Sequence, residues 1–226
     1  MRAHISAAML CLAASWCMPS QADDMSAAYV GGNFARELNS YNTGYLDQQY
    51  VSQAASLGDS LGLTNRSVHR FNWVWWGDAG YFFSPYIALD AAYFHLGELR
   101  YKSAGFLNAG GVADATATSA EITSRGPALS VLGRLPLSES FEADVRLGDY
   151  LGKTNFYDRI EVAGGSAVTT VSKTTSALLA GVGAAYTFGG HWSVRLDYLR
   201  VNKTGDSKTT GTFSVNLASA GVSFFF

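Results

Sequence analysis

Apolar and polar side chains alternate with a period of two along most of this chain. The alternation is clearest over residues 178–188, where Leu178, Val182 and Tyr186 belong to a large apolar set and the residues between them are mostly small. Residues 192–198 repeat it, with large apolar residues between a serine, an arginine and an aspartate. Because successive side chains of a strand point to opposite faces, the pattern predicts β-strands with one large apolar face and one small or polar face.

The same alternation recurs often enough to predict eight strands. They cover residues 27–36, 73–83, 87–93, 129–135, 141–148, 178–188 and 192–198, with a last strand that ends at Phe226. The connections are tight at 84–85, 136–140 and 189–191, and long over 37–69, 103–121, 154–171 and 202–210. Short turns at one end and long loops at the other are typical of membrane barrels. We therefore predict an all-β fold, an eight-stranded antiparallel up-and-down transmembrane β-barrel, with periplasmic termini and extracellular long loops.

The size of the two strand faces indicates which one meets lipid. A soluble barrel of the lipocalin type points its apolar face inward and covers its outside with charge. Here the polar set is mostly Gly, Ala and Ser with a few ions, which suits a narrow lumen, although Trp76 and Phe82 are large exceptions in the inward set. Aromatic residues at strand ends predict two interfacial girdles, the outer one containing Tyr93, Tyr101 and Tyr198.

The amino-terminal segment is expected to be a secretory signal. Arg2 precedes a largely apolar run over residues 7–18, and small residues lead to a cleavage site after Ala22. The run is shorter than the roughly 20 apolar residues that a spanning helix needs. We therefore expect a signal peptide over residues 1–22 and a barrel domain over residues 23–226.

Composition narrows the chemistry. Both cysteines, Cys11 and Cys17, lie inside the expected signal, so the cleaved chain would have no thiol for a disulfide, a metal site or a nucleophile. The formal net charge of −2 at pH 7 gives no basis for nucleic-acid binding. Only 15% of the residues are charged, whereas 24 glycines, 13 phenylalanines and 12 tyrosines favour strands.

Three segments resemble the OmpA-like transmembrane barrel family: residues 77–97, 181–200 and 219–226. The first is similar to the family's first periplasmic turn, and the resemblance covers essentially the whole mature chain apart from the long loops. It implies an outer-membrane location. The best-known member adds a soluble peptidoglycan-binding domain, which we do not expect here, so peptidoglycan tethering is not implied.

The last eight residues resemble the assembly signal of that family. Its elements are Ser219, Gly221, Phe224 and Phe226, with the two phenylalanines on the lipid face. An unpaired strand edge is not tolerated in a membrane, so the last strand is expected to engage the outer-membrane barrel assembly machinery before it closes on the first.

Ionisable residues on the inward faces form a candidate luminal charge network. Its members are Asp78, Asp90, Arg134, Glu142, Asp144, Arg146, Arg195 and Asp197. Because an unpaired charge is costly in a narrow lumen, we interpret them as a salt-bridged plug. A narrow, gated ion path is the alternative.

Two patterns could suggest catalysis, and we assign it to neither. Glu142 and Asp144 lie two positions apart beside Arg146, with no cleft or nucleophile assigned to them. His191 and Ser193 form the His-x-Ser pattern that outer-membrane lipid A deacylases also contain, but here it lies at a periplasmic turn. We expect no catalytic, metal or cofactor site.

Basic residues gather at the outer strand ends and loops. The candidate lipopolysaccharide collar consists of Arg36, Arg70, Arg100, Lys102, Lys153, Lys173, Arg200 and Lys203. Arg125 and Lys208 lie in the same zone. Such a collar would meet the phosphates of lipopolysaccharide, whereas solvated loop charge is the alternative.

These observations favour a monomeric outer-membrane barrel with a structural or surface-interaction role, through adhesion or contact with lipopolysaccharide. A narrow, porin-like channel and a lipid A-modifying enzyme are the competing functions. The expected partners are outer-membrane lipids including lipopolysaccharide, the assembly machinery, and a host or surface ligand if the tyrosine-containing first loop is adhesive.

Overall fold

The computed structural model describes residues 28–38, 51–52, 55, 59–70, 73–109, 112–162, 165–206 and 211–226. The expected signal, residues 1–22, and Lys208 lie outside these ranges. The described residues form nine strands, all paired antiparallel: β1 (Ala28–Glu37), β2 (Ser60–Arg70), β3 (Trp73–Ser84), β4 (Ile87–Ala109), β5 (Val112–Pro136), β6 (Phe141–Val162), β7 (Gly165–Phe188), β8 (Trp192–Asp206) and β9 (Gly211–Phe225).

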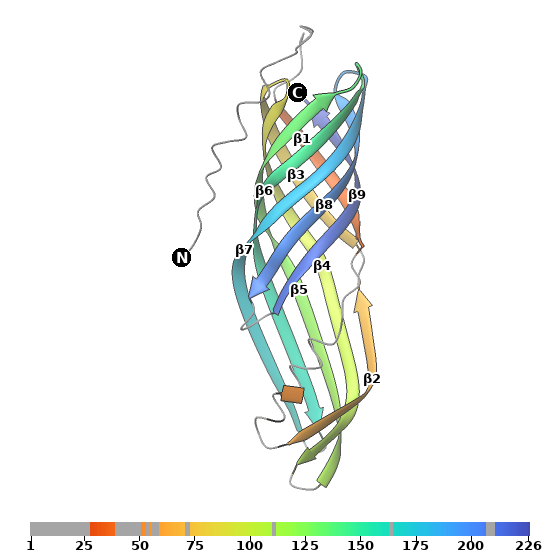
Figure 1. Ribbon diagram of the computed structural model, residues 1–226, viewed down its shortest axis with the longest axis vertical. Helices are drawn as coiled ribbons and strands as arrows, with labels where there is room; N and C mark the ends of the chain where they lie inside the picture. The colour runs from red at the N-terminus through yellow and green to blue at the C-terminus, as the bar shows by residue number, and fades with distance from the viewer. Residues whose placement is uncertain are drawn as a thin grey trace.

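Eight of these described strands close into a barrel, as predicted (Figure 1). Each strand of the set β1 and β3–β9 pairs with its neighbours in chain order, and β9 returns to β1, so that Tyr29 lies opposite Phe225 and Glu37 opposite Leu217. Short turns join β3 to β4, β5 to β6 and β7 to β8 at the end where β1 begins and β9 ends. In the last turn Gly189 and Gly190 both have positive φ, a conformation that glycine adopts without strain.

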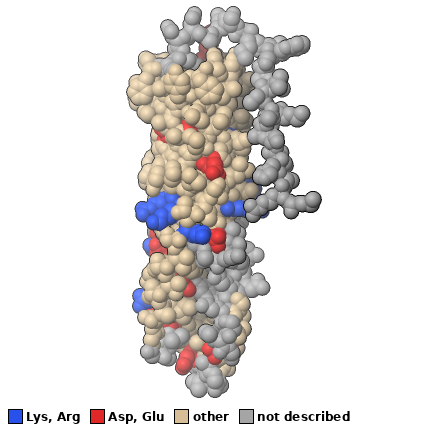
Figure 2. Space-filling view, turned by 90° about the vertical axis from the view of Figure 1, so that its left-hand side faces the viewer, with Lys and Arg blue, Asp and Glu red and all other residues tan. Residues whose placement is uncertain are grey.

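Large apolar side chains cover the outward face of the ring, as the alternation predicts. The inward set contains the small and polar residues, but also more large apolar ones than the two predicted exceptions, among them Phe94, Tyr150 and Leu179. Exposed residues of the ring include Leu129, Val145, Leu147, Val182 and Leu196. Figure 2 shows this largely uncharged surface over the upper half of the molecule, above a band of basic residues. An apolar exterior over a whole barrel is suited to lipid rather than to water.

Two of the predicted long loops are instead extended β-hairpins. Strands β4 and β5 remain paired as far as Ala109 and Val112, and β6 and β7 as far as Val162 and Gly165. The predictions of loops at 103–121 and 154–171 were therefore wrong. These stretches contain Thr and Val, which favour strands, and they continue the ladders of the ring beyond its apolar zone.

The long first connection contains a strand that was not predicted. Strand β2 pairs with the outer half of β4, where Ser60 lies opposite Asn108 and Arg70 opposite Leu99, and it stands outside the closed ring. Residues 51, 52 and 55 are helical. Among the described residues, no helix is long and apolar enough to cross a membrane.

A bulge in β4 reverses which residues of that strand face inward. Pairing with β5 shifts between His95 and Glu98, and Gly97 has a φ of 82°. Before the bulge Ala92 and Phe94 are buried, and after it Tyr101 is only 1% exposed. Tyr101 was predicted to lie in the outer girdle and instead points inward, because one extra residue exchanges the two faces of a strand. Tyr93 and Tyr198 are exposed as expected.

Candidate functional site

The lumen contains a layer of ion pairs made by the eight residues of the luminal charge network. All eight side chains are buried. The pairs join Arg134 Nε to Glu142 Oε2 at 2.8 Å, Arg146 to Asp78 at 3.4 Å and to Asp90 at 3.2 Å, and Arg195 to Asp144 at 3.2 Å and to Asp197 at 3.3 Å. The alternation placed these residues on one face, and the barrel register brings them together from β3, β4, β5, β6 and β8.

Two neutral hydroxyl groups also donate hydrogen bonds to the Asp90 carboxylate. Tyr29 donates its phenolic hydrogen to Asp90 Oδ2 at 2.6 Å, and Ser130 donates to Oδ1 at 3.1 Å. Neither residue was predicted from the sequence, although both lie at inward positions of the alternation. A Cβ atom added at Gly80 would lie 2.3 Å from Tyr29 Cε1, so this glycine makes room for the tyrosine ring.

Arg134 closes the network near the turn end of the barrel. Its guanidinium carbon lies 3.7 Å from the centre of the Phe82 ring and 5.4 Å from that of Phe225. These are cation–π distances, and Glu142 pairs with the same guanidinium. Phe82, the large inward exception noted in the sequence, thus packs against a charge rather than against an apolar neighbour alone.

An apolar layer fills the lumen on the other side of the ion pairs. Its most deeply buried members are Val74, Trp76, Phe94, Tyr150, Leu179, Leu199, Val201, Val215 and Leu217. The ring centres of Trp76 and Phe94 are 4.9 Å apart, and Tyr150 meets Phe94 edge-on at 6.0 Å. A solute moving along the axis would have to cross both this layer and the ionic one.

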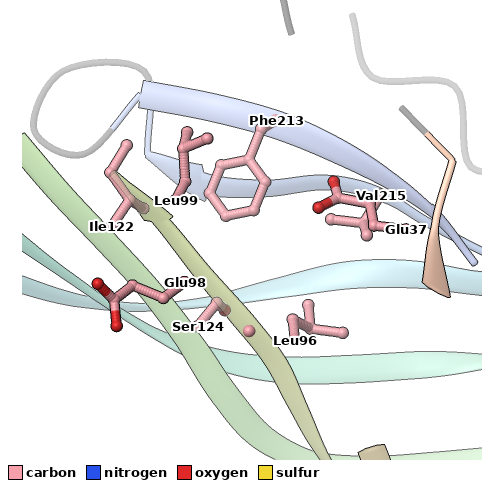
Figure 3. Close-up of a pocket in the computed structure, with 9 residues that line it drawn as sticks. Glu37, Leu96, Glu98, Leu99, Ile122, Ser124, Phe213 and Val215 are labelled. Carbon is pink, nitrogen blue, oxygen red and sulfur yellow. The ribbon is translucent and has the colours of Figure 1, made fainter. Parts of the chain in front are cut away.

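A small pocket lies beyond the apolar layer, toward the long hairpins (Figure 3). Its walls are mainly Leu96, Leu99, Ile122, Phe213 and Val215. The polar lining groups are Glu37, Glu98 and Ser124, and the Ser124 hydroxyl is 3.1 Å from the hydroxyl of Tyr150. Glu98 pairs with Arg100. Of the described lining groups, Glu98 therefore has a cation as its partner and Ser124 has a phenol hydroxyl.

The two patterns considered for catalysis do not form a catalytic arrangement within the described residues. Glu142 and Asp144 each pair with an arginine. His191 Nδ1 lies 3.0 Å from the Phe225 carbonyl oxygen, while Ser193 is buried in the lumen and its hydroxyl has no hydrogen-bond partner there. The described residues also contain no group of three or more His, Cys, Asp or Glu side chains that could hold a metal ion.

The collar residues lie in different settings. Arg36, Lys102, Lys153, Arg200 and Lys203 are exposed. Figure 2 shows several basic residues across the middle of the molecule, with acidic residues beside them.

Three other collar residues differ from that simple picture. Arg100 is neutralised by Glu98 and lies 3.6 Å from Glu121. Lys173 lies opposite Thr154, whose side chain is fully buried, so Lys173 belongs to the inner face of the sheet instead of the outward face. The Arg70 side chain lies outside the described part of the chain.

The residues of the expected assembly signal lie on the closing strand β9. Ser219 and Gly221 face inward, and a Cβ atom at Gly221 would lie 2.0 Å from Asn33 Oδ1. Phe224 packs edge-on against Trp192 and Phe226, with ring centres 4.9 and 5.3 Å away. Phe226 is 62% exposed.

Relatives with curated descriptions are outer-membrane proteins. Outer membrane protein A of Salmonella typhi and that of Yersinia pseudotuberculosis are each 27% identical to this chain over 148 residues, 65% of this chain and 38% of the relative. The match thus spans well under half of the length of these relatives.

Solved structures are similar at lower identity. Ail of Yersinia pestis, in complex with the heparin analogue sucrose octasulfate, has a TM-score of 0.44 and 9% identity, covering 90% of this chain and 100% of that chain. OprG of Pseudomonas aeruginosa has a TM-score of 0.46 and 13% identity, covering 89% and 97%.

A family model gives the assignment. The model described as the OmpA-like transmembrane domain matches residues 28–226, which include every strand of the closed ring. This chain therefore belongs to the OmpA-like transmembrane domain family and is an outer-membrane β-barrel protein.

Proposed function

We propose that this barrel has a structural and surface-contacting role in the outer membrane, without a conducting lumen and without catalysis. In this proposal the chain carries a signal over residues 1–22 and its termini face the periplasm. The long hairpins are extracellular, and the protein acts as a monomer inserted by the barrel assembly machinery. The short turns at one end of the ring and the aromatic end of β9 support this orientation.

The filled lumen is the observation that carries the proposal. Trp76, Phe94 and Tyr150 occupy the axis at one level, and the Arg146 and Arg195 ion pairs occupy the next. Water-filled porins have far wider barrels, and eight strands leave an interior just wide enough for side chains. A narrow channel remains the second candidate function, because a passing ion could replace one partner of an ion pair in the ionic layer.

Contact with lipopolysaccharide is the surface role that the charges favour. Three exposed collar residues, Arg36, Lys153 and Arg200, come two positions after the exposed residues Phe34, Leu151 and Tyr198 of their strands. In this proposal that is the level at which outer-leaflet phosphates lie. Arginine and lysine are the side chains that best match phosphate groups.

One reconstitution separates these functions. The protein is inserted into bilayers with lipopolysaccharide in one leaflet, conductance is recorded, and the lipid is then analysed by mass spectrometry. We expect no continuous conductance, unaltered lipid A, and a higher unfolding temperature with lipopolysaccharide than without it. Steady conductance would establish the channel, and modified lipid A would establish the enzyme.

A further inference from the structure

A row of outward side chains crosses four neighbouring strands at the edge of the apolar belt. Trp75 of β3 lies opposite His95 of β4, His95 opposite Arg125 of β5, and Arg125 opposite Lys153 of β6. Opposed residues of antiparallel strands share a face, and neighbouring strands are about 4.8 Å apart. His95, Arg125 and Lys153 therefore present three nitrogen donors side by side.

The imidazole of His95 is held in one orientation. Its ring stacks on Trp75, with centres 5.7 Å apart and planes 7° from parallel. Gly97 donates its backbone N–H to His95 Nδ1 at 3.2 Å. A neutral ring that accepts at Nδ1 carries its hydrogen on Nε2. The Nε2–H group is therefore the donor that His95 can offer to a ligand.

Arg125 and Lys153 are like charges directly opposite each other. Such pairs destabilise a sheet unless an anion compensates them. Two other outward arginines, Arg100 and Arg159, have acidic partners: Arg100 pairs with Glu98, and Arg159 pairs with Glu161 at 2.9 Å. Within the described residues neither Arg125 nor Lys153 makes an ion pair. The row thus has the donors to bind one anion, and none of its described members is paired with an acidic side chain.

The level of the row indicates the source of that anion. On the side of the short turns, the next outward residues are Tyr93, Pro127 and Leu151, all exposed and apolar or aromatic. On the other side, Thr123 lies opposite Asn155. The row therefore marks the boundary between the apolar belt and the polar zone, where the head-group phosphates of a lipid lie.

We propose that His95, Arg125 and Lys153 form a binding site for one phosphate group of lipid A on the outward face of β4–β6. The proposal rests on the lipopolysaccharide contact proposed above and narrows it to a three-donor site that excludes Arg36, Arg200 and the inward-facing Lys173. The phosphate would accept hydrogen bonds from all three side chains, and Trp75 acts as a positioning residue for His95.

The test compares the variant Arg125→Gln/Lys153→Gln with the matched control Arg36→Gln/Arg200→Gln, which removes the same charge from the outward face of β1 and β8. Each refolded barrel is titrated with lipid A, with dephosphorylated lipid A and with inorganic phosphate. We expect the parent and the control to prefer lipid A over its dephosphorylated form, and Arg125→Gln/Lys153→Gln to lose about tenfold or more in lipid A affinity. In detergent without lipid A it should unfold at no lower temperature than the parent, because like-charge repulsion has been removed.

The alternative outcomes are distinct. Equal losses in the two variants would overturn the site but leave the general contact with lipopolysaccharide standing. If the parent shows no preference for lipid A at all, the proposed surface role itself fails. Stabilisation by inorganic phosphate equal to that by lipid A would indicate a free-anion site and would overturn the lipid source.

Discussion

At the scale of single residues, Arg146 decides the charge balance of the lumen. It is fully buried and bridges Asp78 and Asp90, which come from β3 and β4. A buried ion pair is a weak contributor to stability when intact, yet removing one partner leaves the other charge without compensation. Without Arg146, the two buried carboxylates would face each other with no cation between them. The two hydroxyl donors, Tyr29 and Ser130, both bond to Asp90.

We therefore predict that Arg146→Ala lowers the free energy of unfolding by about 3–5 kcal/mol. The control is Arg159→Ala, which breaks the exposed pair with Glu161 and should cost about 0–1 kcal/mol. Urea unfolding of both variants in lipid vesicles measures the difference. Similar losses in the two variants would mean that the buried network contributes no more than a surface pair.

Gly80 tests whether the Tyr29–Asp90 hydrogen bond depends on space left by a missing side chain. The Tyr29 ring cannot easily swing aside, because it is bonded to Asp90 and packed against Phe82 and Phe225 at 5.7 and 5.6 Å. Gly80→Ala should cost about 1–3 kcal/mol through overpacking. Gly32→Ala is the control, since a Cβ atom there has nothing within 4 Å, and it should change stability by less than about 0.5 kcal/mol. Equal unfolding curves for the two variants would contradict this account.

At the scale of the strands, the sequence predicts the segments that lipid forces to alternate, and it predicts little of the strands outside the apolar zone. Inside the apolar zone each strand must alternate, so the eight ring strands and their inward charges follow from period two. Beyond that zone both faces of a strand can be polar, so the outer parts of β4–β7 show no such alternation. Strand β2 was missed for a related reason, because it is defined by pairing with β4 and not by a clear alternation of its own.

For the luminal charge network, the sequence likewise predicts which residues face inward but not how they pair. Inward parity identifies the eight charged residues, but which arginine meets which acid depends on register. Arg146 and Asp78 are 68 positions apart and meet only because the ring closes with a particular stagger. The bulge at Gly97 is a single glycine among many, so the reversal that buries Tyr101 could not be read from the pattern. The opposition of Arg125 and Lys153 is likewise a consequence of pairing.

At the scale of the whole molecule, two barriers stand in series along the barrel axis. The charged groups of the ionic layer could bind a passing ion, whereas the apolar layer contains no such group. The apolar layer is therefore the one that would exclude hydrated ions. Trp76 and Phe94 supply its largest stacked pair. Their outward counterparts on the same strands, Trp75 and Tyr93, lie on the exterior and touch no part of the axis.

We predict that Trp76→Ala/Phe94→Ala raises conductance in planar bilayers above the silent parent, and that Trp75→Ala/Tyr93→Ala does not. The inner change removes two fully buried aromatic rings, at a cost of about 3–5 kcal/mol each, so folding is first verified by the mobility of the unheated barrel in electrophoresis. The space that opens adjoins the ion pairs of Arg146 and Arg195, which can then be wetted from the side of the long hairpins. A folded inner variant that stays silent would place the barrier in the ionic layer alone, and a parent that already conducts would remove the case for a closed lumen.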